Sequence, residues 1–149
     1  MSEPESPHAG EWPDLRDLLD DEGRAALRDE PGIAGLLREI HRRGPASLPK
    51  RSEAARRAAL SDRVFRQVFP EIARCPWRTF GRRWRIRCAE AALDVARPNQ
   101  KDTARRCGYA STGALTRAFR AQRGITPREF VRRRRRERRR PAGRDDSEE

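Results

Sequence analysis

The sequence predicts an all-α fold of seven helices, in which two similar helical units are joined by one long central helix. The chain repeats itself: Ser61 and the eight residues after it match Ser111 and its successors at an offset of 50, and both copies place apolar residues at positions +3, +4, +7 and +8. This spacing is that of an amphipathic helix. Between the copies, residues 77–95 keep a helical pattern and end before Arg97-Pro98. A helix of that length is a rod that fixes the distance between the two units.

The first 30 residues form an acidic extension, with ten acidic residues against three arginines. Residues 1–10 are rich in proline, serine and glutamate and are expected to be disordered. Residues 11–29 contain apolar side chains that predict one or two short helices: Trp12, Leu15, Leu18, Leu19 and Leu27. We expect the extension to act as a spacer. Two alternatives stay open: it folds back on the basic domain as an electrostatic gate, or it presents its tryptophan and leucines to a partner.

The main domain is predicted to cover residues 31–132 and to begin with a helix over residues 32–43. Apolar side chains in this helix fall at i, i+3, i+4 and i+7, which gives one buried stripe made of Ile33, Leu36, Leu37 and Ile40. Gly44 and Pro45 end the helix.

Each copy of the repeat has the pattern of a helix-turn-helix, in which a short helix and a tight turn precede a serine-capped helix. Ser61 and Ser111 stand at the N-cap positions of the second helices. Gly108 suits the left-handed backbone that such a turn requires. The first copy has Ala59 at the equivalent position, so its turn is expected to use another geometry or to carry strain.

The second helices of the two units are predicted over about residues 61–73 and 111–122. Each docks an apolar face on the domain and leaves its opposite face free to enter a groove of DNA. The apolar faces consist of Val64, Phe65, Val68 and Phe69 in the first unit and Ala114, Leu115, Ala118 and Phe119 in the second. The free faces consist of Asp62, Arg63, Arg66 and Gln67 in the first unit and Thr112, Gly113, Thr116 and Arg117 in the second.

A last helix is predicted to start at a full capping box, with Thr126 as N-cap, Pro127 at the first position and Glu129 at the third. Beyond it, residues 133–149 form an arginine-rich and then acidic tail. The run Arg132–Arg140 is expected either to extend the last helix or to follow a phosphate backbone, and a solvated basic run is an equally weighted alternative.

The distribution of charge favours a polyanionic partner. The net charge of the chain is +12, and residues 31–140 alone carry +22. Such a concentration of one sign repels itself unless a polyanion offsets it. Nucleic acid is the first candidate and an anionic membrane the second. No apolar run is long enough to span a bilayer and no signal peptide opens the chain, so a cytoplasmic location is expected.

Catalysis and metal binding are not expected, and no cofactor is implied. His8 lies in the extension and His41 at an arginine-rich helix end, and the acidic residues of the basic domain are scattered. The three cysteines, Cys75, Cys88 and Cys107, form no CxxC pair and are expected to be free and buried.

The stretch from Ala104 to Phe130 resembles the signature of the AraC/XylS family of bacterial transcriptional regulators: an alanine, a Gly-aromatic pair, a serine, Arg-x-Phe and then Gly-x-Thr-Pro. The resemblance covers about residues 31–132 and implies a seven-helix DNA-binding domain whose third and sixth helices enter the major groove. Carried over by position, the base-reading residues are Arg63, Arg66, Gln67, Thr112, Gly113 and Arg117, and Thr116 shares their helix face. One departure is Arg74, which stands where the family's first unit usually has glycine.

We therefore predict a non-enzymatic, sequence-specific transcriptional regulator that inserts its two recognition helices into successive major-groove segments of double-stranded DNA, about 34 Å apart. The resemblance implies a short family member without a ligand-sensing domain, which binds DNA as a monomer. Two alternatives stay open: nonspecific architectural packaging of nucleic acid, and an adaptor that contacts RNA polymerase through the acidic N-terminus.

Overall fold

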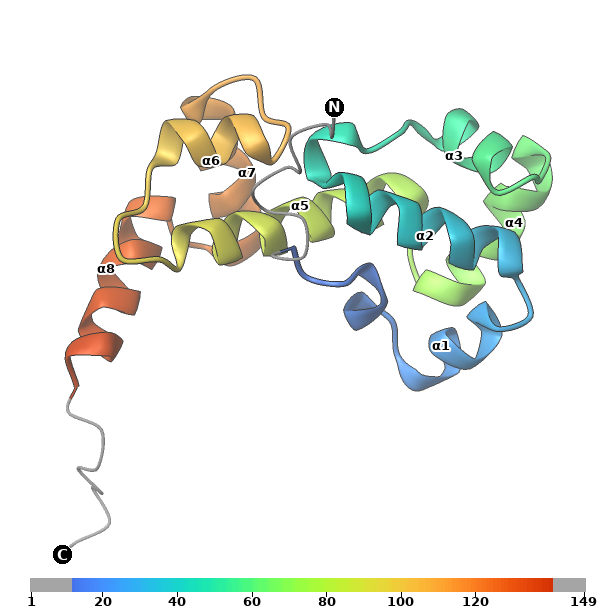
Figure 1. Ribbon diagram of the computed structural model, residues 1–149, viewed down its shortest axis with the longest axis horizontal. Coiled ribbons are helices and arrows are strands. Elements are labelled where there is room, and N and C mark those ends of the chain that lie inside the picture. Colours follow the sequence, from blue (N-terminus) through green and yellow to red (C-terminus); the bar gives the residue numbers. More distant parts are fainter. Residues whose placement is uncertain (1–11, 141–149) are drawn as a thin grey trace, which may run out of the picture.

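The computed structural model describes residues 12–140, and within this range every regular element is a helix. Two short 3-10 helices and eight α-helices follow one another along the chain (Figure 1). Their bounds are η1 Leu15–Leu18, α1 Asp21–Leu27, α2 Pro31–Arg43, η2 Pro45–Ser47, α3 Arg51–Arg57, α4 Asp62–Ala73, α5 Trp77–Leu93, α6 Gln100–Arg106, α7 Thr112–Arg123 and α8 Pro127–Arg139. Helices α2 to α8 are the seven of the predicted domain, and η1 and α1 correspond to the one or two short helices predicted within residues 11–29.

The long helix α5 runs through the middle of the molecule and carries a helical unit at each end (Figure 1). The first unit, residues 51–73, consists of α3 and α4 and packs with α2 and the start of α5. The second unit, residues 100–123, consists of α6 and α7 and packs with the end of α5 and with α8. The predicted arrangement of two units on a central rod is confirmed.

The buried side chains of both units and of α5 belong to one continuous hydrophobic core. The predicted stripe of α2 is confirmed, because Ile33, Leu36, Leu37 and Ile40 are all buried. Around the start of α5, the rings of Phe65, Phe69, Trp77 and Phe80 form a cluster with centroid separations of 5.1–6.1 Å. Aromatic pairs at this distance contribute about 0.5–1.5 kcal/mol each beyond the area that they bury.

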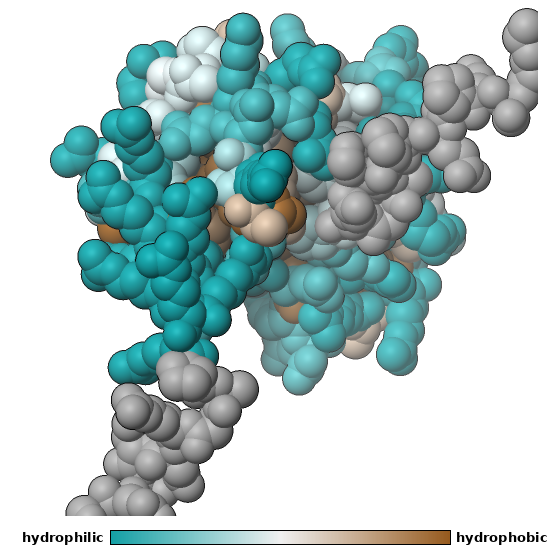
Figure 2. Space-filling view, turned by 60° about the vertical axis from the view of Figure 1, so that its left-hand side comes forward, coloured by the Kyte–Doolittle hydropathy of each residue, from teal (hydrophilic) through white to brown (hydrophobic). Residues whose placement is uncertain are grey.

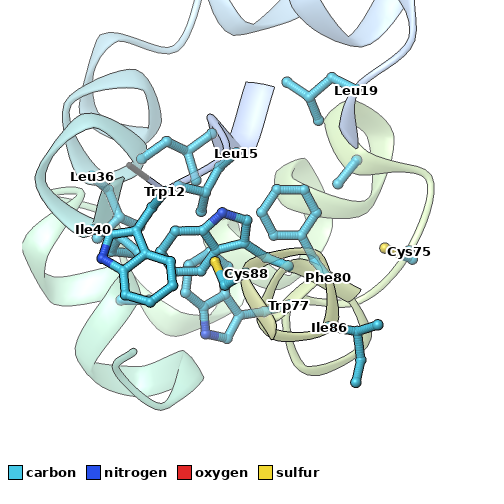
Figure 3. Close-up of a cluster of buried hydrophobic side chains, with 14 of the residues drawn as sticks. Trp12, Leu15, Leu19, Leu36, Ile40, Cys75, Trp77, Phe80, Ile86 and Cys88 are labelled. Carbon is cyan, nitrogen blue, oxygen red and sulfur yellow. The ribbon is translucent and has the colours of Figure 1, made fainter. Parts of the chain in front are cut away.

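The acidic extension is part of this core from Trp12 onward. Trp12, Leu15, Leu19 and Leu27 are buried, and α1 packs against α2 and α4 (Figure 3). The hypothesis that Trp12, Leu15, Leu18 and Leu19 are presented to a partner is therefore wrong for Trp12, Leu15 and Leu19, because these three are buried in the core, and Leu18 is partly buried against it. Residues 1–11, including His8, lie outside the described residues.

The basic run after the capping box is helical. Thr126 caps α8, with its hydroxyl accepting from the backbone N–H of Glu129 at 3.2 Å, and α8 continues to Arg139. The prediction that the arginine-rich run extends the last helix is therefore confirmed. None of the helices in residues 12–140 combines the length and the apolar character that crossing a membrane requires.

Candidate nucleic-acid interface

The two helix-turn-helix units match in their hydrogen bonds as well as in their sequences. In the first turn the N–H of Leu60 donates to the carbonyl of Ala55 at 3.0 Å, and in the second the N–H of Tyr109 donates to the carbonyl of Ala104 at 2.8 Å. A 6→1 bond of this kind requires a left-handed residue just before the donor. That residue is Gly108 in the second unit, with φ of +85°.

In the first unit the left-handed residue is Ala59, with φ of +58°. The sequence leaves two outcomes for this turn, another geometry or strain, and the structure shows the strained one. A non-glycine residue in this conformation costs roughly 1–2 kcal/mol. The first unit thus keeps the turn geometry of the second unit without a glycine.

Both recognition helices, α4 and α7, begin at the predicted serine caps. The Ser61 hydroxyl accepts from the N–H of Val64 at 3.2 Å, and the Ser111 hydroxyl accepts from the N–H of Ala114 at 3.1 Å. At the start of α4 the carboxylate of Asp62 also pairs with Arg51 at 3.1 Å, which ties the first turn of α4 to the first turn of α3. The caps fix where each helix starts and hence which side chains stand at its exposed end.

The predicted reading positions are gathered on the outer faces of α4 and α7. Arg63, Arg66 and Gln67 are exposed on α4, and Thr112, Gly113 and Arg117 are exposed on α7. Among the side-chain hydrogen bonds and ion pairs formed within residues 12–140, none involves the side chains of Arg63, Arg66, Gln67 or Arg117. These groups are thus available to a ligand without breaking a contact of the protein.

On α7, Thr116 and Gly113 offer less to a ligand than Arg117 does. The hydroxyl of Thr116 donates to the carbonyl of Thr112 at 2.9 Å, and Thr116 is only partly exposed. A Cβ on Gly113 would lie 3.5 Å from the guanidinium of Arg117, so this arginine extends over the bare backbone of Gly113. Glycine here leaves Arg117 as the one long reading side chain on the exposed face of α7.

Val64 departs from the prediction. The sequence pattern assigns it to the apolar face of α4 with Phe65 and Phe69, which are fully buried, but 39% of Val64 is exposed. Val64 and Val95 are the only large exposed apolar side chains in the described part of the chain. An exposed valine one residue from Arg63 is a candidate for contact with a thymine methyl group. Sequence periodicity could not have found it, because positions at the border of an apolar stripe fall on either side of the solvent boundary.

The second unit contains a buried hydroxyl, that of Thr103, and a partly buried phenol, that of Tyr109. Thr103 is buried and its hydroxyl donates to the carbonyl of Asn99 at 2.8 Å, so its polar atom is satisfied. Burial raises the pKa of Tyr109 to about 12, so the phenol stays neutral at physiological pH. Tyr109 therefore packs beside the turn as a neutral aromatic side chain and adds no charge to the interface.

The end of the molecule that carries α6, α7 and α8 is mostly hydrophilic, with a pale patch and a few small hydrophobic spots (Figure 2). Two exposed helices with unpaired arginines, each held by a short turn at one end of a rigid rod, define a double helix-turn-helix DNA-binding protein. A helix-turn-helix domain family matches residues 54–134, more than half of the chain. The chain belongs to this family, the AraC-type helix-turn-helix proteins.

Solved structures of the same fold agree with this assignment. A DNA-binding transcriptional dual regulator from Escherichia coli K-12 is 18% identical, with a TM-score of 0.61 over 70% of this chain and 90% of that one. An AraC-type transcriptional regulator from Chromobacterium violaceum is 17% identical, with a TM-score of 0.64 over 72% and 96%. The DNA-binding domain of the global transcriptional factor AdpA, solved with a target DNA, is 21% identical, with a TM-score of 0.59 over 82% and 100%. No curated protein matches the sequence.

Proposed function

We propose that this protein is a sequence-specific transcriptional regulator that places α4 and α7 in successive major-groove segments of one DNA duplex. The observation that carries the proposal is the duplicated geometry: two serine-capped helices expose arginine and glutamine side chains that make no hydrogen bond or ion pair within the described part of the protein. Arginine side chains that are exposed and unpaired on such helices are suited to base edges and phosphates.

Three long side chains are proposed to read bases. The guanidinium groups of Arg66 and Arg117 fit the paired acceptors O6 and N7 of guanine, and the amide of Gln67 fits N6 and N7 of adenine. Each such contact discriminates against a wrong base by about 1–3 kcal/mol. Val64 adds a methyl contact on the first half-site, whereas Gly113 adds none on the second. The first half-site should therefore be read at more positions than the second.

One chain supplies both readers, so a monomer can occupy a complete site. The 17 residues of α5 span about 26 Å. This length together with the width of the units is close to one helical turn of DNA, about 34 Å. We propose binding as a monomer, and light scattering of the protein–DNA complex tests it. A stoichiometry of two chains per site would contradict the monomer.

The arginines of α8 divide into two sets, and we propose that one set contacts DNA phosphates. Arg138 pairs with Asp94 at 2.7 Å and Arg134 pairs with Glu137 at 3.0 Å, so these two are engaged within the protein. A second set, spaced at i, i+4 and i+7, lines a shallow concavity beside the loop that leads into α6; it consists of Arg128, Arg132 and Arg135. Helix α6 is the first helix of the second unit, so this set lies next to the recognition machinery.

The decisive experiment is a selection from a random DNA library with the purified protein. The variants Arg66→Ala and Arg117→Ala should each relax base preference at one position and leave the rest of the site intact. Arg28→Ala is the matched control, because Arg28 is exposed, belongs to neither recognition helix and follows α1, which contacts α4 at Ile72, beyond the reading positions Arg63, Arg66 and Gln67. An unchanged preference in both reading variants would refute their roles. Recovery of no consensus would favour charge-driven packaging, the alternative that the charge of +22 in residues 31–140 supports.

The phosphate contacts are tested by the salt dependence of binding. Replacing Arg132 and Arg135 with glutamine should reduce the slope of log affinity against log salt by about 0.9 for each phosphate that the protein no longer neutralises. Arg138→Gln should change the slope less, because this side chain is already paired with Asp94. Equal slopes for the paired and unpaired sets would contradict a directed phosphate contact.

A further inference from the structure

A segment outside both units joins them to each other. Residues 12–18, which we call the strap, comprise Trp12, its two following residues and η1. The strap packs on α2 and α5 and reaches α6, so it touches elements from both ends of the molecule. Nothing in the reading of bases requires it.

The strap is anchored first at the end of α2. The ring nitrogen Nε2 of His41 lies 2.8 Å from the carbonyl oxygen of Trp12. The indole nitrogen of Trp12 would lie 3.0 Å from a Cβ on Gly44, so the ring rests against the backbone at the point where α2 stops. Leu15, three residues on, is fully buried (Figure 3). These contacts hold the strap in one position relative to the first half of the molecule.

The strap is anchored next on the central helix. The indole N–H of Trp84, in the middle of α5, donates to the carbonyl of Pro13 at 2.8 Å across a sequence separation of 71 residues. Trp84 itself is fully buried. A buried hydrogen bond of this kind fixes the path of the strap along α5, because breaking it would leave a buried donor without a partner.

The third contact reaches the second unit. The guanidinium carbon of Arg106, at the end of α6, lies 5.0 Å from the centroid of the Trp12 ring, within the range of a cation–π interaction. Beside it, a Cβ on Gly108 would lie 3.1 Å from Cα of Ala46 and 3.2 Å from the carbonyl oxygen of Pro45. The turn of the second unit thus sits against η2 and next to Trp12. Together these contacts form a joint between the two units alongside α5.

We propose that the strap fixes the relative orientation of the two units and thereby sets the half-site spacing that the protein accepts. This rests on the proposed function. A single added base pair moves one half-site by about 3.4 Å and rotates it by about 35° relative to the other. A helix such as α5 resists bending, but the joint at Trp12, Arg106 and Gly108 adds a second connection that resists rotation of one unit about the rod.

The test on DNA uses the selected site and versions of it with one or two base pairs added to or removed from the centre. The intact protein should prefer one spacing. Trp12→Ala should reduce the ratio of affinities between the best and the neighbouring spacings by about fivefold, since contacting groups couple by about 0.5–3 kcal/mol. Leu27→Ala is the matched control: it is buried in the same extension, but its helix α1 packs on α2 and α4. The control should weaken all spacings alike, and an unchanged ratio in Trp12→Ala overturns the proposal.

A second readout does not depend on DNA. Spin labels at the exposed positions Glu71 and Ala121, introduced as Glu71→Cys and Ala121→Cys on α4 and α7, report the distance between the recognition helices. Trp12→Ala should broaden the distance distribution and Leu27→Ala should not. If Trp12→Ala fails to fold, Arg106→Ala removes the same cation–π contact from the side of α6, with Asp102→Ala as the control for the loss of the ion pair between Arg106 and Asp102. A distribution that stays narrow in the folded variant overturns the strap's role, whereas the absence of any selectable site overturns the proposed function instead.

Discussion

The two units share a backbone plan but achieve it with different residues. At three equivalent positions the second unit has Gly108, Gly124 and Arg120, and the first has Ala59, Arg74 and Pro70. Ala59 and Arg74 adopt φ of +58° and +62°, close to the +85° and +73° of the glycines. Pro70 lies inside α4 and has no N–H to donate to the preceding turn. The first unit therefore accepts strain that the second avoids.

The first unit offsets this strain with additional packing. Its recognition helix buries Phe65, Phe69, Ile72 and Ala73, whereas α7 buries only Leu115 and Phe119. Helix α1 lies so close to the end of α4 that a Cβ on Gly23 would sit 2.2 Å from the carbonyl oxygen of Ile72. The comparison indicates that a repeated motif tolerates unfavourable turn residues where its core is large, and needs favourable ones where its core is small.

The largest expected difference between the units is in their cores. Phe69 contacts the rings of Phe65, Trp77 and Phe80 at 5.1–5.3 Å, and its counterpart Phe119 contacts Phe130 at 5.4 Å. Truncating a buried phenylalanine costs about 3–5 kcal/mol. We expect the loss in free energy of unfolding to lie at or above the top of this range for Phe69→Ala and near the bottom for Phe119→Ala. Urea denaturation measures both. Equal destabilisation would mean that the aromatic cluster does not compensate for the strained turns.

Exchanging the turn residues should change stability in opposite directions. Ala59→Gly relieves a left-handed alanine and should stabilise the protein by about 1 kcal/mol. Gly108→Ala introduces the same strain, and its Cβ would approach Ala46 and Pro45 to 3.1–3.2 Å, so a destabilisation of about 2–3 kcal/mol is expected. Thermal denaturation of both variants checks the signs. A destabilising Ala59→Gly would show that the first turn is not strained.

Local signals in the sequence were enough to predict most of the fold. The caps at Ser61, Ser111 and Thr126 each depend on a residue three positions away, and the strain at Ala59 follows from comparison with Gly108. Local signals also predicted one or two short helices within residues 11–29, but they left open whether the face that carries Trp12, Leu15 and Leu19 is buried or presented to a partner.

What that face packs against could not be predicted. The partners of the strap are His41, Trp84 and Arg106, which lie roughly 30 to 95 residues further along the chain. No local pattern links residues so far apart. The exposed faces of α4 and α7 were predicted from local spacing, whereas the bases that these faces would meet belong to another molecule and follow from no pattern in this chain.

A smaller effect is expected where the first unit replaces glycine with Arg74. Its side chain pairs with Asp20 at 3.3 Å and with Glu22, and these pairs are exposed. A hydrogen bond from the N–H of Gly23, together with Arg74, holds the pKa of Asp20 below its ordinary value of 3.8. The stabilisation from this carboxylate is thus complete above about pH 4 and is lost as the pH falls through the lowered pKa.

Arg74→Gly should therefore change stability little at neutral pH, because the relief of backbone strain and the removal of exposed ion pairs oppose each other. The variant should also lose less stability than the intact protein in high salt and on acidification. Denaturation curves at two salt concentrations, and at about pH 7 and pH 3, measure this. A variant with the same salt and acid dependence as the intact protein would show that the ion pairs contribute nothing.

The smallest expected difference concerns the reactivity of the buried cysteines, which depends on how readily each unit opens by local unfolding. Cys75 follows α4, and Cys107 follows α6; both are free and buried, as expected, and burial raises the pKa of both thiols, that of Cys107 to about 12. Alkylation in the native protein at about pH 8 should be slow at both. Because the unfolded thiols ionise near pH 9 and the folded ones do not, stability should fall as the pH rises above 9.

With rising urea below the unfolding transition, Cys107 should react before Cys75, because the second unit has the smaller core and opens at lower free energy. Peptide mass spectrometry after alkylation gives the order, and earlier labelling of Cys75 would reverse the ranking of the two units.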